Sequence, residues 1–519
     1  MKTAAPYFGA AIFLSMNISI TFSNAKNGSK TCSLNGVPLH SNYNPEREAR
    51  QFVDSVDADF LPSFILITEP ALSYCVLPLK ERFPGSKICA VRYCRDFKSE
   101  DKFFDRVFYL DKPDYGKNLE RELFSYMGDE GICSCRFLSW LPAAKIFPAH
   151  DKAAWGAVKN TVKLSQASLV THSYFAQRWF GNACIFCSSV KKTAFVKRGN
   201  MPVVITASGS SLENLPDLLK KCRNTYFLIA LSSSLLPLLN AGIKPDLVLS
   251  CDGGYWAKRH LEVLQNHHDI PVALSVEAAC PKKIMETNTV IPLGFSDGLE
   301  TVMAKSCGFE LMNAERNGTV SGTALKFALD ITDGDVYFCG LDLAPGKGLQ
   351  HCRPNRLELI AEISDDRIKS KESRIASARV NSQPLEIYRQ WFSAENSAFK
   401  GRVYRLFENF KYENSLGSIE DADFTFFNKR TVESSKKSNF CKIIMENTEL
   451  SPCSVRAGQT ESFIVSNSSS EEWLHSIFPA EYLSWKRSVK DGEQKLEVLE
   501  KKNEDFLTCL QRKLCRTRI

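Results

Sequence analysis

The sequence lacks several of the signatures that identify a protein's function directly. It contains no G-x-x-x-x-G-K-[ST] phosphate loop, and no G-x-G-x-x-G follows its first clear α/β strand, Phe64–Thr68. Beyond the amino terminus, no apolar segment approaches the roughly 20 residues of a membrane-spanning helix. Lysine and arginine are dispersed until the C-terminal quarter and the net charge is only +7, so the composition gives no case for nucleic-acid binding.

The 18 cysteines show no repeated spacing. Cys184 and Cys187 form the only CxxC pair, and neither a second pair nor a histidine partner follows them. Many others, such as Cys89, Cys251 and Cys339, lie inside apolar runs, where cysteine packs as a small hydrophobic residue. The sequence therefore predicts buried, reduced cysteines, no metal site built from them, and a cytoplasmic protein.

The amino terminus allows two interpretations. Lys2, the apolar stretch from Ala4 to Leu14 and the small residues of Ser23-Asn24-Ala25 resemble a signal peptide, which would export the protein. Alternatively, Met16 is the true start and the alternating segment Asn17–Phe22 is an edge strand that opens the fold. The sequence favours the second interpretation.

A chain of 519 residues is too long for one hydrophobic core, so several domains are expected. Strands and helices alternate over residues 60–150, and again over 200–360 with strand starts about every twenty residues, the pace of parallel sheets covered by helices. We predict an α/β protein with two Rossmann-like parallel-sheet domains joined by helices and a helical C-terminal region. The expected segments are a strand-and-turn unit at 1–45, a Rossmann-like domain at 46–150, a helical connector at 151–199, a nucleotide-binding domain at 200–360, a helical extension at 361–430, and a linker with an amphipathic C-terminal helix at 431–519.

The stretch Met201–Asp252 carries the clearest site signal. An apolar run from Pro202 to Ala207 leads directly into Ser208-Gly209-Ser210-Ser211, which indicates a strand followed by a tight turn and a helix start. Ser210 and Glu213 have the spacing of a capping box. Free N–H groups at such a helix start favour a phosphate or a nucleotide.

Three further polar turns end predicted strands or open a helix in the same domain. They are Ser232-Ser233-Ser234, Asp252-Gly253-Gly254, and the segment Asn317–Thr323, which is followed by the strand that leads to Asp342. Because parallel strands place their carboxyl ends at one edge, these turns are expected to converge there. We predict a nucleotide site in which N–H groups hold phosphates and carboxylates hold ribose hydroxyls or a metal. Its residues are Ser208, Gly209, Ser210, Ser211, Ser232, Asp252, Gly253, Thr319, Ser321, Gly322 and Asp342.

The order of these motifs resembles a known family. Ile205–Leu212, Gly242–Asp246, Asp252, Gly318–Ala324 and Gly340–Leu343 are similar to segments of the motility accessory factor (Maf) family, whose central domain resembles 6-hydroxymethylpterin diphosphokinases of the MptE type. The chain is more distantly similar to bacterial sialyltransferases. It departs from these families in having Ser208 where the transferases have asparagine, and Ser210 where both groups have proline.

The resemblance implies a function. Maf proteins are implicated in transferring nonulosonic acids from CMP-sugars to serine and threonine residues of flagellin. Ser208–Ser211 and Ser321-Gly322 would then hold the CMP moiety, Asp252 would lie near the ribose or the reacting centre, and His351 would be the catalytic base.

Two alternatives remain open at this stage. In a diphosphokinase, ATP would lie on the serine-rich turn, and Asp252 with Asp246 or Asp342 would hold Mg²⁺. In a non-catalytic flagellin-binding protein, the nucleotide fold would be kept without the chemistry.

Overall fold

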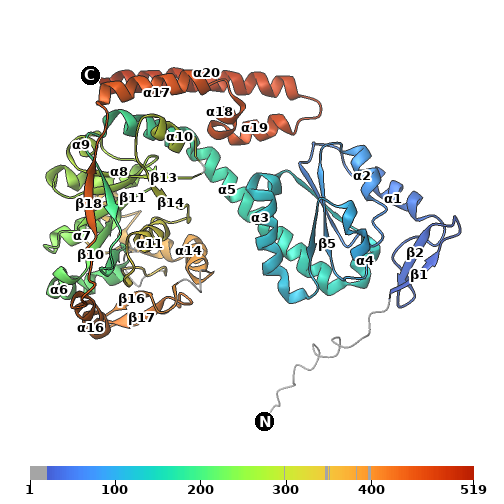
Figure 1. Ribbon diagram of the computed structural model, residues 1–519, viewed down its shortest axis with the longest axis horizontal. Coiled ribbons are helices and arrows are strands. Elements are labelled where there is room, and N and C mark those ends of the chain that lie inside the picture. The colour runs from blue at the N-terminus through green and yellow to red at the C-terminus, as the bar shows by residue number, and fades with distance from the viewer. Residues whose placement is uncertain are drawn as a thin grey trace, which may run out of the picture. The chain divides into compact units, whose positions relative to one another are not determined.

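The protein divides into two compact units. The computed structural model describes residues 20–296, 298–344, 349, 351–380, 383–394 and 399–518. One unit comprises Met1–Tyr174 with Phe478–Lys502, and the other comprises Phe175–Ile477 with Asn503–Ile519 (Figure 1). The signal-peptide interpretation and the start at Met16 rest mainly on residues 1–19, which lie outside the described ranges.

The first unit contains a parallel sheet in the order β6-β5-β4-β7, with helices between the strands. The strand order reverses at β4, which is the Rossmann-like arrangement predicted for this region. A separate hairpin sheet, β1-β2-β3, precedes it. The elements are β1 (Ile20–Asn24), β2 (Lys30–Leu34), β3 (Val37–Pro38), α1 (Pro45–Asp54), β4 (Phe64–Thr68), α2 (Val76–Arg82), β5 (Lys87–Arg92), β6 (Arg106–Tyr109), α3 (Gly116–Cys133), β7 (Cys135–Ser139), α4 (Leu141–Ile146) and α19 (Pro479–Lys486).

The long helix α5 (Pro148–Ser189) occupies most of the predicted helical connector and passes from the first unit into the second. Cys184 and Cys187 lie in its last turns and are fully buried. All the described cysteines are unpaired, as the sequence predicts.

The second unit is built on an 11-stranded sheet in the order β17-β16-β15-β9-β10-β11-β12-β13-β8-β18, with β14 beside β13. Every pair is parallel except β8 with β18. The strands are β8 (Thr193–Lys197), β9 (Val203–Thr206), β10 (Phe227–Leu231), β11 (Leu247–Ser250), β12 (Val272–Ser275), β13 (Val290–Phe295), β14 (Met312–Ala314), β15 (Val336–Cys339), β16 (Val403–Phe407), β17 (Glu420–Asp423) and β18 (Ile444–Thr448).

The central strands are short apolar runs in which every residue is buried, as expected for parallel strands covered on both faces. Helix α11 (Val320–Ile331) packs against β9, β10, β11 and β15. The other helices are α6 (Pro216–Lys221), α7 (Leu235–Asn240), α8 (Tyr255–Leu261), α9 (Lys282–Thr287), α10 (Leu299–Ser306), α12 (Arg356–Ser364), α13 (Lys371–Val380), α14 (Gln383–Ala394), α16 (Phe424–Ser435), α17 (Cys453–Asn467), α18 (Glu471–Ile477) and α20 (Gly492–Arg518).

The strand order of this sheet reverses between β9 and β15. From β9 the chain adds β10 to β13 on one side, and it then returns through α11 to place β15, β16 and β17 on the other side. In open α/β sheets such a reversal marks where ligands bind, at the carboxyl ends of the two strands. The turns that the sequence singles out at Ser208 and Asp342 follow these two strands.

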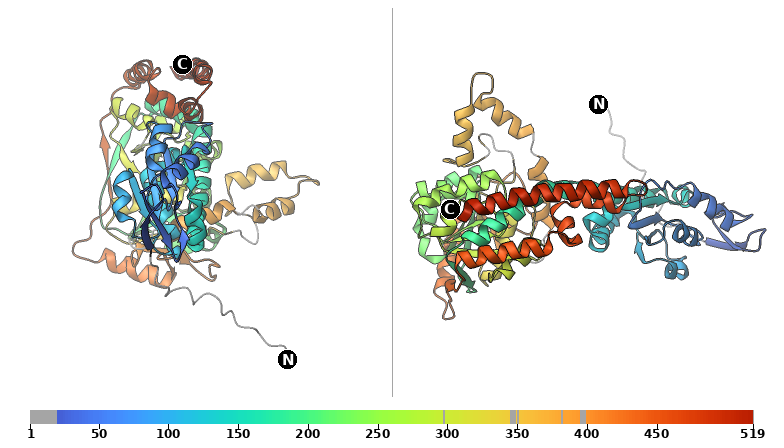
Figure 2. Two further views of the ribbon diagram at one scale, coloured as in Figure 1. Left: turned by 90° about the vertical axis from the view of Figure 1, so that its right-hand side faces the viewer. Right: turned by 90° about the horizontal axis from the view of Figure 1, so that it is seen from above.

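The prediction of a helical extension over 361–430 is only partly correct, because β16 and β17 continue the parallel sheet there. The charged Arg405 obscured the strand pattern. It is fully buried in β16, where its guanidinium pairs with Asp421 of β17 at 2.7 Å (Nε to Oδ1). Helices α13 and α14 do form. Helix α13 belongs to the part that projects from the second unit (Figure 2), whereas Phe392 of α14 is buried against Phe338 of β15.

The prediction of a loose linker before the C-terminal helix is wrong. Strand β18 and helices α17 and α18 occupy that region. The serines and threonines that indicated a loop lie partly inside α17, where Thr460 is buried and donates a hydrogen bond to the carbonyl of Arg456. The apolar stripe of the C-terminal helix is confirmed, since Leu499, Phe506, Leu510 and Leu514 of α20 are buried. Within the described ranges, no helix has both the length and the apolarity needed to cross a membrane.

Candidate functional site

The turns after β9 and β15 are joined through Asp342. Its carboxylate accepts hydrogen bonds from the Ser211 N–H (3.0 Å), the Ser210 hydroxyl (3.2 Å) and the Ser211 hydroxyl. The Gly209 N–H donates to the carbonyl of Gly340 at 2.8 Å. Asp342 therefore occupies donors of the turn that the sequence analysis assigned to a phosphate.

The local structure after β9 also differs from the predicted capping box. Residues Ser210–Asn214 form a 3-10 turn that no side chain caps, and the short helix α6 follows. Ser210 donates to Asp342 instead, and the Glu213 carboxylate accepts from the Arg353 N–H at 2.8 Å. The capping box fails because both of its side chains find partners from distant parts of the chain.

A later segment of the chain lies over this turn. His351 forms an isolated antiparallel bridge with Gly209, and the Cys352 N–H donates to the carbonyl of Ser208 at 2.9 Å. These backbone bonds place His351, the base implied by the family resemblance, beside the serine-rich turn.

The imidazole of His351 is held by a buried carboxylate. Its Nδ1 lies 3.2 Å from Oε1 of Glu358, and the other oxygen of Glu358 accepts from Arg374 at 2.5 Å. Burial alone would raise the pKa of Glu358, but the hydrogen bonds from His351 and Arg374 outweigh burial, so the pKa is lowered. An ionised Glu358 favours the tautomer in which Nδ1 carries the proton and Nε2 is free to accept one.

The turns after β10 and β11 lie farther along the same edge. Ser232 is buried, and the carbonyl of Ser233 accepts from the Asn355 side chain at 3.0 Å. Asp252 is exposed, and its Oδ1 accepts from the Gly254 N–H at 2.8 Å, which closes the turn before α8.

The amino end of α11 lies close to Asp252. Thr319 caps the helix by accepting from the Gly322 N–H at 2.9 Å. Thr323 in the first turn donates to the carbonyl of Glu315 at 2.8 Å and adjoins the thiol of Cys251, the residue before Asp252. A Cβ on Gly322 would lie 2.7 Å from Asn317, so the close packing of this turn requires glycine. Ser321 remains partly exposed at this helix end.

A buried ion pair that no sequence motif indicates lies beside Asp252. Glu277, which follows β12, is almost fully buried and pairs with Arg316 through both oxygens, at 3.0 and 2.5 Å. The Arg316 guanidinium lies over the ring of Trp179, which packs directly on Gly253. Each of these residues stands alone in the sequence, and only the position of Glu277 just after a buried strand could have indicated it.

The carboxylates proposed as metal ligands lie in different turns. Asp252 accepts a hydrogen bond from the Gly254 N–H, and Asp342 accepts from the Ser211 N–H. Within the described ranges, no group of three or more His, Cys, Asp or Glu residues could hold a metal ion. The Mg²⁺ site of the diphosphokinase alternative, which needs only one or two carboxylates with substrate phosphates, stays a prediction.

Part of the second unit matches a known family model. Residues 181–348 match the family model described as 6-hydroxymethylpterin diphosphokinase MptE-like. The region that matches, residues 181–348, is called the MptE-like domain. It is also 26% identical over 388 residues to an "Uncharacterized protein" of Treponema pallidum (strain Nichols), a match that covers 73% of this chain and 86% of the relative.

One solved structure is similar to nearly the whole chain. The Maf glycosyltransferase from Magnetospirillum magneticum AMB-1 aligns with a TM-score of 0.47 and 11% identity, over 96% of this chain and 92% of that one. Similarity at this level carries no inference about activity.

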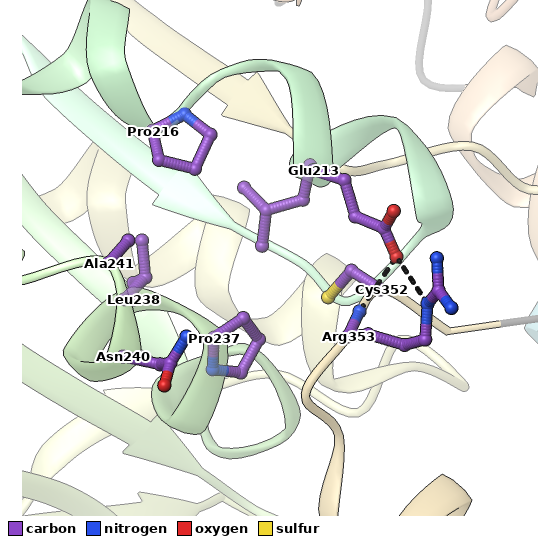
Figure 3. A pocket seen from close by; sticks show the side chains of 9 residues that line it. Glu213, Pro216, Pro237, Leu238, Asn240, Ala241, Cys352 and Arg353 are labelled. Atoms are coloured by element: carbon purple, nitrogen blue, oxygen red, sulfur yellow. Dashed lines mark hydrogen bonds and ion pairs between the residues drawn. The ribbon is translucent and has the colours of Figure 1, made fainter.

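A cavity of about 310 Å³ adjoins the serine-rich turn of the MptE-like domain (Figure 3). Its walls come from the 3-10 turn and α6, from α7, and from the segment that follows His351. The lining residues are Leu212, Glu213, Pro216, Pro237, Leu238, Asn240, Ala241, Cys352 and Arg353.

The close approach at Gly209 yields a first prediction. A Cβ at this position would lie 2.5 Å from both Cγ of Asp342 and the carbonyl oxygen of Gly340. Gly209→Ala should therefore push the two turns apart and destabilise the protein by about 1–3 kcal/mol. Thermal unfolding measures the loss. Gly458→Ala is the control, because a Cβ at this position meets nothing within 4 Å. Gly458 also lies in helix α17, where alanine is favoured over glycine. Equal midpoints for the two variants would contradict the packing described.

His260 yields a second prediction. Burial, and then the nearby His351, lower the pKa of His260 from 6.5 to about 4. Between these values the unfolded chain binds a proton that the folded chain does not. The contribution of His260 to stability is therefore fully present above pH 6.5 and is lost as the pH falls towards 4. His260→Gln should remove this loss, so the variant should gain about 1–2 kcal/mol relative to the wild type between pH 7 and pH 5. Parallel pH profiles of denaturant unfolding for the two proteins would contradict it.

Proposed function

We propose that the second unit is a glycosyltransferase that uses a nucleotide-activated sugar and transfers the sugar to a hydroxyl group. The observation that carries the proposal is the His351–Glu358 pair, which backbone hydrogen bonds hold on the turn after β9 where the sheet order reverses. A histidine oriented by a carboxylate is the arrangement expected of a general base.

The donor nucleotide is proposed to bind along the carboxyl edge of the sheet. Because Asp342 occupies donors of the serine-rich turn, the donor phosphate is proposed to contact the amino end of α11 and the exposed guanidinium of Arg353. This helix has 12 residues, and its first turn presents backbone N–H groups and the Ser321 hydroxyl beside the turn that contains Asp252. Asp252, exposed at that turn, is placed to accept from ribose hydroxyls.

The proposed reaction requires one proton transfer. As the acceptor oxygen forms its bond to the anomeric carbon, its proton passes to Nε2 of His351. The bond from the anomeric carbon to the phosphate oxygen breaks, and the nucleotide leaves with the bonding electrons. Glu358 stabilises the imidazolium that results, and Arg374 keeps Glu358 ionised.

The finer assignment rests on the family resemblance. We propose a CMP-linked nonulosonic acid as the donor and serine or threonine hydroxyls of flagellin as acceptors. The MptE-like match favours a second candidate, pyrophosphoryl transfer from ATP to 6-hydroxymethylpterin. Asp252 and Asp342, the carboxylates proposed to hold Mg²⁺, accept hydrogen bonds in separate turns, so we rank this candidate second.

The third prediction concerns the proposed base. His351→Gln and Glu358→Gln should lower the rate of sugar transfer from a CMP-nonulosonic acid to flagellin by about 10²–10⁴-fold for the histidine, and by less for the glutamate, which only orients it. CMP binding, measured by calorimetry, should change little in either variant. His268→Gln, an exposed histidine after α8, is the matched control.

Three outcomes would contradict the proposal. If the His351→Gln variant transferred sugar at the wild-type rate, His351 would not be the catalytic base. Formation of AMP from ATP with a pterin alcohol, and no sugar transfer, would establish the second candidate. Flagellin binding with no activity in either assay would indicate the non-catalytic protein.

A further inference from the structure

We propose that the cavity beside the serine-rich turn binds the base of the donor nucleotide. The inference rests on the proposed function. It assigns a nucleotide-binding role to residues that are not among those predicted from the sequence. The site would take a planar heterocycle, with the sugar and phosphate lying towards the carboxyl edge of the sheet.

The walls of the cavity suit a flat ring. Pro216 lies on one side and Pro237, Leu238 and Ala241 lie on the other, so apolar groups from two helices face each other across the space (Figure 3). The volume of about 310 Å³ is at the lower end of the range of small-molecule sites, about 300–1,000 Å³. Such a space suits a base better than a whole nucleotide sugar.

Polar groups at the cavity are few and are placed at its margin. Asn240 ends α7, is exposed, and offers both a donor and an acceptor to the edge of a base. Arg353 lies at the cavity with Nε 3.5 Å from Oε1 of Glu213, and its side chain is 61% exposed. A long, exposed guanidinium can turn to a phosphate at low cost.

Two lining residues of the cavity are bonded to the turn of the proposed active site. Leu212 donates its N–H to the carbonyl of Gly209 at 3.1 Å. Cys352 donates its N–H to the carbonyl of Ser208 and directly follows His351. A nucleotide base in the cavity would therefore lie against Cys352, the residue that follows the proposed catalytic base His351. It would also lie next to the turn after β9, where the strand order reverses.

The experiment is calorimetric binding of cytidine and CMP to the full chain. Ala241→Phe fills the cavity and should abolish the binding of both. Asn240→Ala removes one hydrogen-bonding group and should weaken both about fivefold. Arg353→Gln should weaken CMP about tenfold and leave cytidine unchanged, because only CMP carries a phosphate.

Controls and outcomes separate this inference from the proposed function. Ala457→Phe, at a half-buried alanine of α17, and Asn266→Ala, at an exposed asparagine after α8, should bind both ligands as the wild type does. If Ala241→Phe keeps wild-type CMP affinity, the base site is overturned while the proposed function stands. If the wild type binds neither cytidine nor CMP, both fail. If binding follows the predictions but no sugar is transferred, the base site stands and the glycosyltransferase proposal fails.

Discussion

The carboxylate of Asp342 ties together the two strands between which the sheet reverses its order. It accepts from the backbone of Ser211 and from two serine hydroxyls, and a charged acceptor makes such bonds stronger than neutral ones. The turns after β9 and β15 are thereby held so close that Gly209 has no room for a side chain. The segment carrying His351 then has a fixed surface to lie on. An anionic ligand must accordingly find its donors elsewhere, at α11 or at Arg353.

The features that the sequence predicted correctly are those set by residues close together in the chain. Apolar runs followed by small polar residues correctly located β9, β10 and β11 and their turns, because a fully buried parallel strand must end where the chain reaches solvent. The helix cap at Thr319 and the apolar stripe of α20 are equally local patterns, and both are present.

Features that depend on distant partners were not predictable in the same way. An arginine is normally expected at the surface, but Arg405 is buried because Asp421 on the neighbouring strand pairs with it. The capping box of Ser210 and Glu213 satisfies the spacing rule, yet Asp342 and Arg353, each more than a hundred residues away in the chain, compete successfully for both side chains. Glu358 and the Glu277–Arg316 pair carry no motif, so only the fold brings them to the site.

The link from Glu358 to Arg374 has a consequence for charge balance. Arg374 also pairs with Asp365 at 2.8 Å, so His351, Glu358, Arg374 and Asp365 form one connected cluster. With a neutral imidazole the cluster carries one net negative charge, and with a protonated imidazole it carries none. Because Arg374 balances only one of the two carboxylates, a net negative charge lies beside the neutral imidazole of His351.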